Sequence, residues 1–164
     1  MNTLTDALHI PDTQSERDER HLPIQRVGVK DVRWPLNLRV AGQVQSTVAQ
    51  WDLDVALPAE KKGTHMSRFV AWLDQQHVPL DAAVLREQLA VMLQALGADE
   101  GRIEARFSFF IRKRAPVSGV QSLLDYQGRW VAETSAGVTR IHAEVGVPVK
   151  SLCPCSKEIS DYGA

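Results

Sequence analysis

The sequence predicts an α+β domain in which two helices cover one face of an antiparallel sheet. Two strand-like stretches precede residue 58, and three more follow residue 101. Between these groups lie two stretches whose apolar residues repeat with the period of a helix. Because no helical stretch separates the later strands, a doubly wound parallel sheet is not expected.

Composition limits the possible functions. The 164 residues suffice for one domain with a core. A net charge of −1 produces no global field that would attract nucleic acid or a membrane surface. The apolar runs are too short to cross a bilayer, and the N-terminus lacks the features of a signal peptide. We therefore expect a cytoplasmic protein that binds neither nucleic acid nor a membrane.

The N-terminal part predicts a leader followed by a hairpin. Residues 1–25 are polar and rich in charge, which is typical of a flexible leader. Apolar side chains alternate with polar ones over residues 32–40 and again over residues 51–57. The short link, which begins at Gly42, predicts that the two strands pair as an antiparallel hairpin.

The middle of the chain predicts two helices. Thr64 is the expected N-cap of the first helix, and Asp81 is the expected N-cap of the second, which Gly97 should end. The predicted buried stripes are Met66, Phe69, Val70 and Leu73 on the first helix, and Leu85, Leu89, Met92 and Leu96 on the second.

The remaining residues predict three strands. Residues 103–111 alternate clearly, and residues 120–134 predict a further strand that is interrupted near Gln127 and Gly128. The last strand covers residues 141–149. A lone final strand would leave an unpaired edge, so it either joins the first sheet or begins a second module.

The strongest candidate for chemistry is the pair Cys153 and Cys155, which Pro154 separates in a loop after the last strand. A thiolate is both a nucleophile and a ligand for zinc-like metals, and the residues alone do not separate these roles. Two cysteines this close do not easily form a disulfide, which fits a reducing compartment. Lys157 would lower the pKa of a neighbouring thiol.

Other candidates lie outside this loop. Lys61, Lys62 and His65 precede the first helix, where free backbone N–H groups and basic side chains could hold an anion. His142 and Glu144 lie on the polar face of the last strand and could line a cavity shared with the cysteine loop. Ordinary solvated side chains are an equally simple interpretation of these residues.

Three stretches resemble GTP cyclohydrolase type IB. They are Gln25–Val29 with the following strand, KGTHMSRF at Lys62–Phe69, and SLCPCSKEISDYGA at Ser151–Ala164. This resemblance implies a tunnelling fold, a ββααββ module that assembles side by side into a homo-oligomer. Residues 26–134 would form one full module, and residues 135–164 the start of a second.

The resemblance also implies an activity. Enzymes of this family hydrolyse GTP to formate and 7,8-dihydroneopterin triphosphate, the first step of tetrahydrofolate biosynthesis. They use a divalent ion of the manganese, zinc or iron class, which lowers the pKa of a bound water. By the resemblance, Cys153 is the catalytic metal ligand. Cys155, Lys157 and His65 are candidates for contacts to the substrate or to the ligands of the metal.

The chain departs from the family at its end. In the family a histidine ligand follows the Tyr-Gly-Ala stretch, and glutamates that bind metal and guanine come later. We therefore expect that the chain is cut short at Ala164, and that these 164 residues alone are inactive. Two alternatives remain open: an NADPH-dependent 7-cyano-7-deazaguanine (nitrile) reductase with Cys153 as nucleophile, and a non-catalytic oligomerising module.

Overall fold

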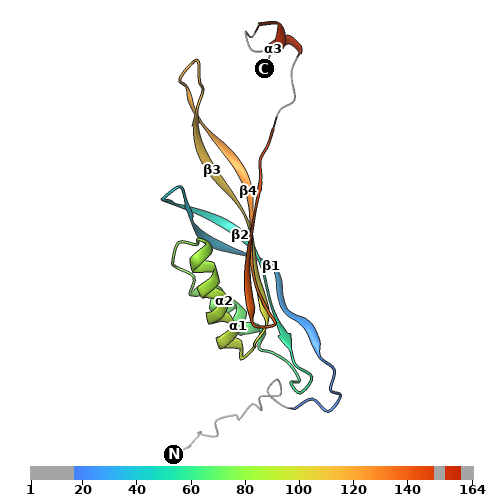
Figure 1. Ribbon diagram of the computed structural model, residues 1–164. Coiled ribbons are helices and arrows are strands. Elements are labelled where there is room, and N and C mark those ends of the chain that lie inside the picture. The colour runs from blue at the N-terminus through green and yellow to red at the C-terminus, as the bar shows by residue number, and fades with distance from the viewer. Residues whose placement is uncertain (1–16, 150–153, 160–164) are drawn as a thin grey trace, which may run out of the picture.

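The computed structural model describes residues 17–149 and 154–159 and confirms the α+β class (Figure 1). The elements are, in chain order, β1 (Ile24–Val40), β2 (Gln43–Leu57), α1 (Met66–Asp74), α2 (Ala82–Leu96), β3 (Gly101–Arg114), β4 (Gln121–Ser135), β5 (Val138–Gly146) and α3 (Pro154–Ile159).

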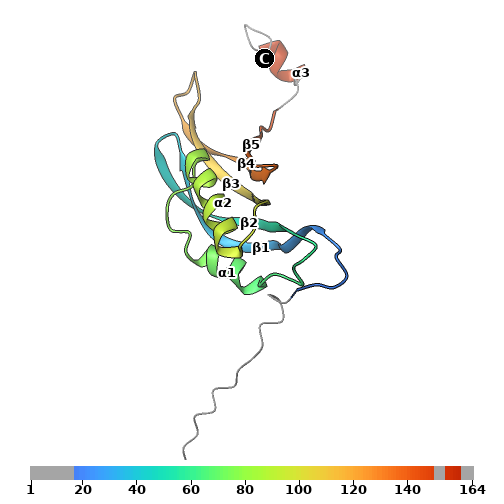
Figure 2. The same cartoon turned by 60° about the horizontal axis from the view of Figure 1, so that its bottom comes forward.

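The five strands form one antiparallel sheet in the order β1-β2-β3-β4-β5, so each strand pairs with its neighbours in the sequence. Helices α1 and α2 connect β2 to β3 and lie together on one face of the sheet (Figures 1 and 2). This arrangement fits a fold of the tunnelling type. No helix in the described ranges is long and apolar enough to span a membrane.

Two tight turns hold the outer hairpins. Ala41 and Gly42, between β1 and β2, have φ angles of 47° and 80°, and Ala136 and Gly137, between β4 and β5, have φ angles of 49° and 73°. Two consecutive positive φ angles give the turn a twist that matches the twist of paired strands. Glycine adopts this conformation without the steric cost that alanine incurs, so each turn combines one permissive and one strained residue.

The core lies between the sheet and the two helices. The largest fully buried side chains include Trp51 from β2, Phe69 from α1 and Leu85 from α2. Trp51 also meets Trp72 of α1 edge to face, with 6.0 Å between the ring centroids. The stripe predicted for α2 is buried as expected, but α1 buries Phe69, Trp72 and Leu73.

The other two members of the stripe predicted for α1, Met66 and Val70, are exposed. A helix of nine residues buries only a narrow stripe of side chains. In α1 the large side chain of Trp72 takes part in this stripe in place of Met66 and Val70.

The structure confirms the predicted caps of α2 but not the predicted N-cap of α1. Asp81 caps α2 as expected, since its carboxylate accepts hydrogen bonds from the backbone N–H groups of Ala83 and Val84, each at 3.0 Å. Gly97 ends α2 with a φ of 60°. The N-cap of α1, in contrast, is His65 and not Thr64, and it makes no side-chain capping bond. Thr64 is buried, so its side chain serves packing.

The predicted interruption of β4 is wrong. The strand runs without a break from Gln121 to Ser135, and Gly128 pairs with Phe107 of β3. A Cβ at residue 128 would lie 2.5 Å from Cε2 of the Phe107 ring. Glycine is therefore required here because the ring covers the strand, and it does not mark a turn.

The last strand joins the first sheet, which is one of the two arrangements that the sequence left open. β5 pairs with β4 from Ser135↔Val138 to Gln127↔Gly146. The predicted boundary between the two modules, at residues 134 and 135, falls beside the turn between β4 and β5. The division into two modules stays a prediction.

Part of the predicted leader is attached to the domain. The backbone N–H of Asp18 donates to the carbonyl of Glu60 at 2.9 Å, and Arg17 forms a β-bridge with Lys61. Asp18 itself is 8 % exposed and binds Arg20. The rest of the predicted leader, residues 1–16, lies outside the described residues.

Candidate functional site

The predicted thiol site is described only in part. Cys153 lies outside the described residues. Its neighbours Pro154–Ile159 form the short helix α3, where only a loop was predicted. Proline suits the first position of a helix because its missing N–H would have no partner there. Cys155 is a free, exposed thiol, and Lys157 is an exposed residue in the last turn of the same helix.

The basic residues before α1 do not join this site. His65 is half-buried at the start of α1, and the ammonium group of Lys61 donates to the carbonyl of Gly97 at the end of α2. Helices α1 and α3 lie at opposite ends of the structure in both views (Figures 1 and 2). Within one copy of the chain, His65 is therefore not brought close to Cys155 or Lys157.

The polar face of the sheet contains a buried charge cluster around Glu104 of β3. Glu104 is 3 % exposed, although its position in the alternating pattern places it opposite the helices. It accepts hydrogen bonds from Arg129 of β4, from Nε at 2.8 Å and from Nη2 at 3.0 Å. Arg102 and Arg106 of β3 also bind it, the latter at 3.1 Å.

This cluster extends across the whole sheet. Arg106 also contacts Asp31 of β1 at 2.8 Å and Asp52 of β2 at 3.1 Å. Arg129 reaches the other edge and binds Glu144 of β5. Asp31 sits at a register shift of β1 with a φ of 58°, and its N–H donates to Asp52 at 2.9 Å. The ion pairs therefore link all five strands.

The hydrogen bonds between Glu104 and Arg129 shift the pKa values of both side chains. The hydrogen bonds from Arg129 hold the pKa of Glu104 below its ordinary value, although burial opposes the shift. The same contact raises the pKa of the Arg129 guanidinium. Both groups therefore stay charged at neutral pH, since each has hydrogen-bond partners of opposite charge.

His142 and Glu144 line a hollow of about 480 Å³ on this polar face. Arg102 and Arg129 contribute to the same hollow from β3 and β4. The prediction that His142 and Glu144 line a cavity is thus met, but the described residues of the cysteine segment are not part of its lining.

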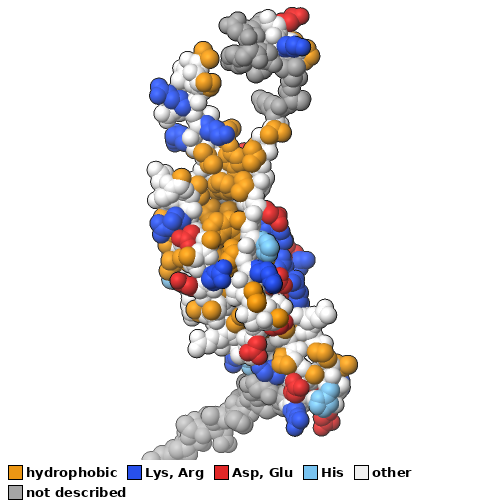
Figure 3. All heavy atoms as spheres, viewed as in Figure 1, with side chains coloured by type: hydrophobic (Ala, Val, Ile, Leu, Met, Phe, Trp, Pro, Cys, Tyr) orange, Lys and Arg blue, Asp and Glu red, His pale blue; other side chains and the backbone are white. Residues whose placement is uncertain are grey.

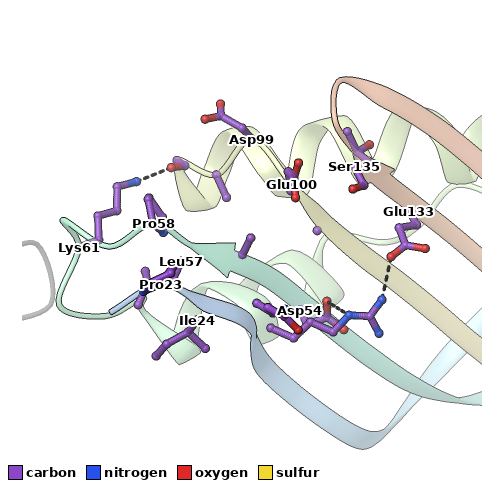
Figure 4. A pocket seen from close by; sticks show the side chains of 17 residues that line it. Pro23, Ile24, Asp54, Leu57, Pro58, Lys61, Asp99, Glu100, Glu133 and Ser135 are labelled. Atoms are coloured by element: carbon purple, nitrogen blue, oxygen red, sulfur yellow. Dashed lines mark hydrogen bonds and ion pairs between the residues drawn. The ribbon is translucent and has the colours of Figure 1, made fainter. Parts of the chain in front are cut away.

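A larger cavity, of about 710 Å³, lies where β1 starts and β2 ends, and we call it the strand-end pocket (Figure 4). Arg26 crosses it and binds Glu133 at 2.7 Å and Asp54 at 3.8 Å. Burial raises the pKa of Asp54, because the attraction of Arg26 does not fully offset desolvation. Apolar side chains, including the buried Leu57, line the other side.

A divalent ion fits no group of residues within the described part of the chain. Residues 17–149 and 154–159 contain no group of three or more His, Cys, Asp or Glu side chains that could hold a metal. A tetrahedral site needs such a set, so Cys155 alone cannot form one.

Glu104, Arg129 and Asp54 are not among the residues that the sequence singles out. Each lies on the polar side of an alternating strand, where exposure is the usual expectation. The pairing register gives no simple signal either, because Glu104 faces Val131 and Arg129 faces Arg106. The cluster forms between diagonal neighbours on the two strands.

Comparison with known proteins identifies the family. Residues 10–164 match the family model described as type I GTP cyclohydrolase folE2. A GTP cyclohydrolase FolE2 from Methylibium petroleiphilum is 73 % identical over 160 residues, which cover 95 % of this chain and 54 % of the relative. The FolE2 of Paraburkholderia xenovorans is 58 % identical over 165 residues, which cover 100 % of this chain and 62 % of the relative.

The chain thus spans between about half and three fifths of the length of these curated relatives. Their names favour the cyclohydrolase interpretation over the nitrile reductase and over the non-catalytic module. The matched residues include both the KGTHMSRF and the SLCPCSKEISDYGA stretches. The chain therefore belongs to the type I GTP cyclohydrolase folE2 family.

Proposed function

We propose that this protein acts in the hydrolysis of GTP to formate and 7,8-dihydroneopterin triphosphate, the first step of tetrahydrofolate biosynthesis. The family match over residues 10–164 carries this proposal, and the 73 % identity to a relative named GTP cyclohydrolase FolE2 supports it. GTP is accordingly the proposed substrate, and the cytoplasm the proposed location.

Cys153 is the proposed catalytic residue, and its thiolate is the proposed ligand of a divalent ion of the manganese, zinc or iron class. A thiolate is a suitable ligand for zinc-class ions. Cys155 and Lys157 are proposed to support it, since both lie on α3 directly after Pro154. A role for His65 requires a site that combines more than one copy, because α1 and α3 lie far apart within one chain (Figure 1).

A homo-oligomer with sheets side by side is the proposed assembly. Within the described residues, β5 pairs on one side only, whereas the outer edge of β1 is partly occupied by a parallel bridge between Leu38 and Leu80. The two edges differ. β1 contains two register shifts and Pro35, all of which hinder further pairing, whereas no register shift interrupts the pairing of β5 with β4.

The test is an assay for both products. The protein as cells produce it is incubated with GTP, and formate and the fluorescent pterin formed by oxidation of the product are measured together. We expect equal amounts of the two, and loss of both after treatment with a chelator. No formate from metal-loaded protein would contradict the proposal.

The same assay applied to the 164 residues alone tests a separate expectation. The sequence predicts that these residues do not turn over GTP by themselves. Robust formate release by these 164 residues would show that they are active alone, against this expectation. The same result would support the proposed hydrolysis of GTP.

A further inference from the structure

The hairpin between β3 and β4 extends well beyond the rest of the sheet, and we call residues 108–126 the arm. The pairing of β2 with β3 stops at Ala49↔Phe107, and the pairing of β4 with β5 stops at Gln127↔Gly146. Beyond these pairs the arm is tied to β2 only at its base, where the Gln45 side chain binds the backbone of Phe110 at 2.7 and 3.0 Å.

The surface of the arm is both apolar and basic. Phe110 is 46 % exposed, Leu123 is 55 % exposed and Val117, at the tip, is 87 % exposed. Arg112, Lys113 and Arg114 follow one another, whereas Asp125 is the single acidic residue among residues 108–126. Figure 3 shows apolar side chains and Lys and Arg side chains gathered towards this end of the molecule. A surface of this kind usually marks an interaction site.

The tip of the arm is ordered rather than a loose loop. The backbone N–H of Ala115 donates to the carbonyl of Val120 at 2.8 Å, and that of Gly119 donates to the carbonyl of Ala115 at 3.0 Å. The Arg114 guanidinium binds the carbonyl of Gly119 at 3.1 Å. Val117 is therefore presented at the end of a preformed turn, and little conformational entropy remains to be lost on binding.

The strand-end pocket is apolar and acidic, and so complements the apolar and basic surface of the arm. Four carboxylates line it, against two cationic side chains. Asp54 and Glu133 already bind Arg26, so Asp99 and Glu100 remain to face a partner. The apolar side includes the exposed Ile24 beside Leu57 and Pro58 (Figure 4). A volume of about 710 Å³ lies in the range of pockets that hold ligands.

The arm cannot reach the pocket of its own chain. β3 begins at the pocket, with Gly101, and ends in the arm, with Arg114. Its 14 residues span roughly 45 Å at about 3.3 Å per residue. An arm that docks into this pocket would therefore belong to a second copy of the chain.

We propose that the arm of one copy docks into the strand-end pocket of a second copy. The tip residue Val117 would meet the apolar side, and the basic residues of the arm would face Asp99 and Glu100. Pairing of arm with arm is disfavoured, because it would bring two sets of three basic residues together. This contact differs from pairing between sheet edges, and it does not depend on the proposed activity.

The first experiment is a charge insertion at the tip. Val117→Asp places a carboxylate on a side chain that is already exposed, so folding should not change. We expect the association between copies, measured by analytical ultracentrifugation, to weaken about tenfold or more. The control is Val78→Asp, since Val78 is 56 % exposed in the segment between α1 and α2 and belongs neither to the arm nor to the lining of the pocket. Equal association of the two variants would overturn the proposal.

The second experiment identifies the partner surface by cross-linking. In a background with Cys153→Ser and Cys155→Ser, one chain carries Val117→Cys and another carries Asp99→Cys, and the two are co-expressed and treated with a short bismaleimide. A head-to-tail contact predicts a cross-linked pair only when both variants are present. Cross-linking of Val117→Cys chains alone would overturn the proposal in favour of an arm-to-arm contact, and a purely monomeric protein would also overturn it.

Discussion

Arg129 of β4 binds Glu104 of β3 through two hydrogen bonds, of 2.8 and 3.0 Å, and at the same time binds Glu144 of β5. The edge strand β5 is thereby linked to the centre of the sheet by charge as well as by its backbone pairing.

Glu104→Gln should destabilise the fold. The substitution leaves three arginines around a neutral side chain, and we expect a loss of about 2 to 3 kcal/mol, below the value for a fully buried pair because the arginines are partly exposed. Urea denaturation measures the loss. The control is Glu144→Gln, whose carboxylate is 62 % exposed and should cost at most about 1 kcal/mol. Equal losses of stability in the two variants would contradict the conclusion that the buried carboxylate of Glu104 stabilises the fold more than Glu144 does.

The pH dependence of stability should report the same residue. The pKa of Glu104 is lower in the folded protein than its ordinary value of 4.5. Its contribution is therefore fully present above about pH 4.5 and is lost as the pH falls through the folded pKa. The difference in unfolding free energy between the unmodified protein and Glu104→Gln should be constant near neutral pH and should shrink below pH 4.5. A difference that grows on acidification would contradict the assignment.

Gly128→Ala should be costly because of the Phe107 ring. The new methyl group would lie 2.5 Å from Cε2 of the ring, so the ring or the strand must move. We expect a loss of about 1 to 3 kcal/mol, typical of overpacking. Gly146→Ala, on the paired strand β5, is the control, since its nearest neighbour would be at 3.6 Å. Thermal unfolding of the two variants measures the loss of stability in each. A Gly128→Ala variant as stable as the unmodified protein would contradict the packing argument.

Asp81→Ala should remove the cap of α2. Two backbone N–H groups lose their acceptor, which typically costs about 0.5 to 2 kcal/mol. Asp81→Asn keeps an acceptor but loses the ion pair with Arg39 at 3.5 Å, so it should retain most of the stability. If both variants lose the same amount in chemical denaturation, the ion pair and not the cap is responsible.

Local patterns predict most of the fold because they depend on a few neighbouring residues. Alternation gives the strands, Asp81 and Gly97 mark the ends of α2, and the short link at Gly42 predicts the first hairpin. The same reasoning fails at Gly128, because the reason for that glycine is a ring on the neighbouring strand. It fails at Thr64 for a similar reason, since the burial of this residue depends on tertiary packing.

The site could be predicted less completely than the fold. The position of Cys153 and Cys155 after a strand was read from the sequence, but the buried state of Glu104 and the strand-end pocket arise only when five strands lie side by side. Residues far apart in the sequence, such as Asp31 and Arg106, meet through this pairing. Single-sequence patterns do not contain that information.

The most direct test of the proposed function compares one cysteine variant and one lysine variant of the protein as cells produce it. Formate release from GTP is measured with saturating manganese or zinc for Cys153→Ser and for Lys157→Ala, which keeps both thiols. We predict that Cys153→Ser loses formate release by several orders of magnitude together with bound metal, whereas Lys157→Ala, one of the supporting candidates, retains its metal. Full activity and full metal content in Cys153→Ser would contradict the account.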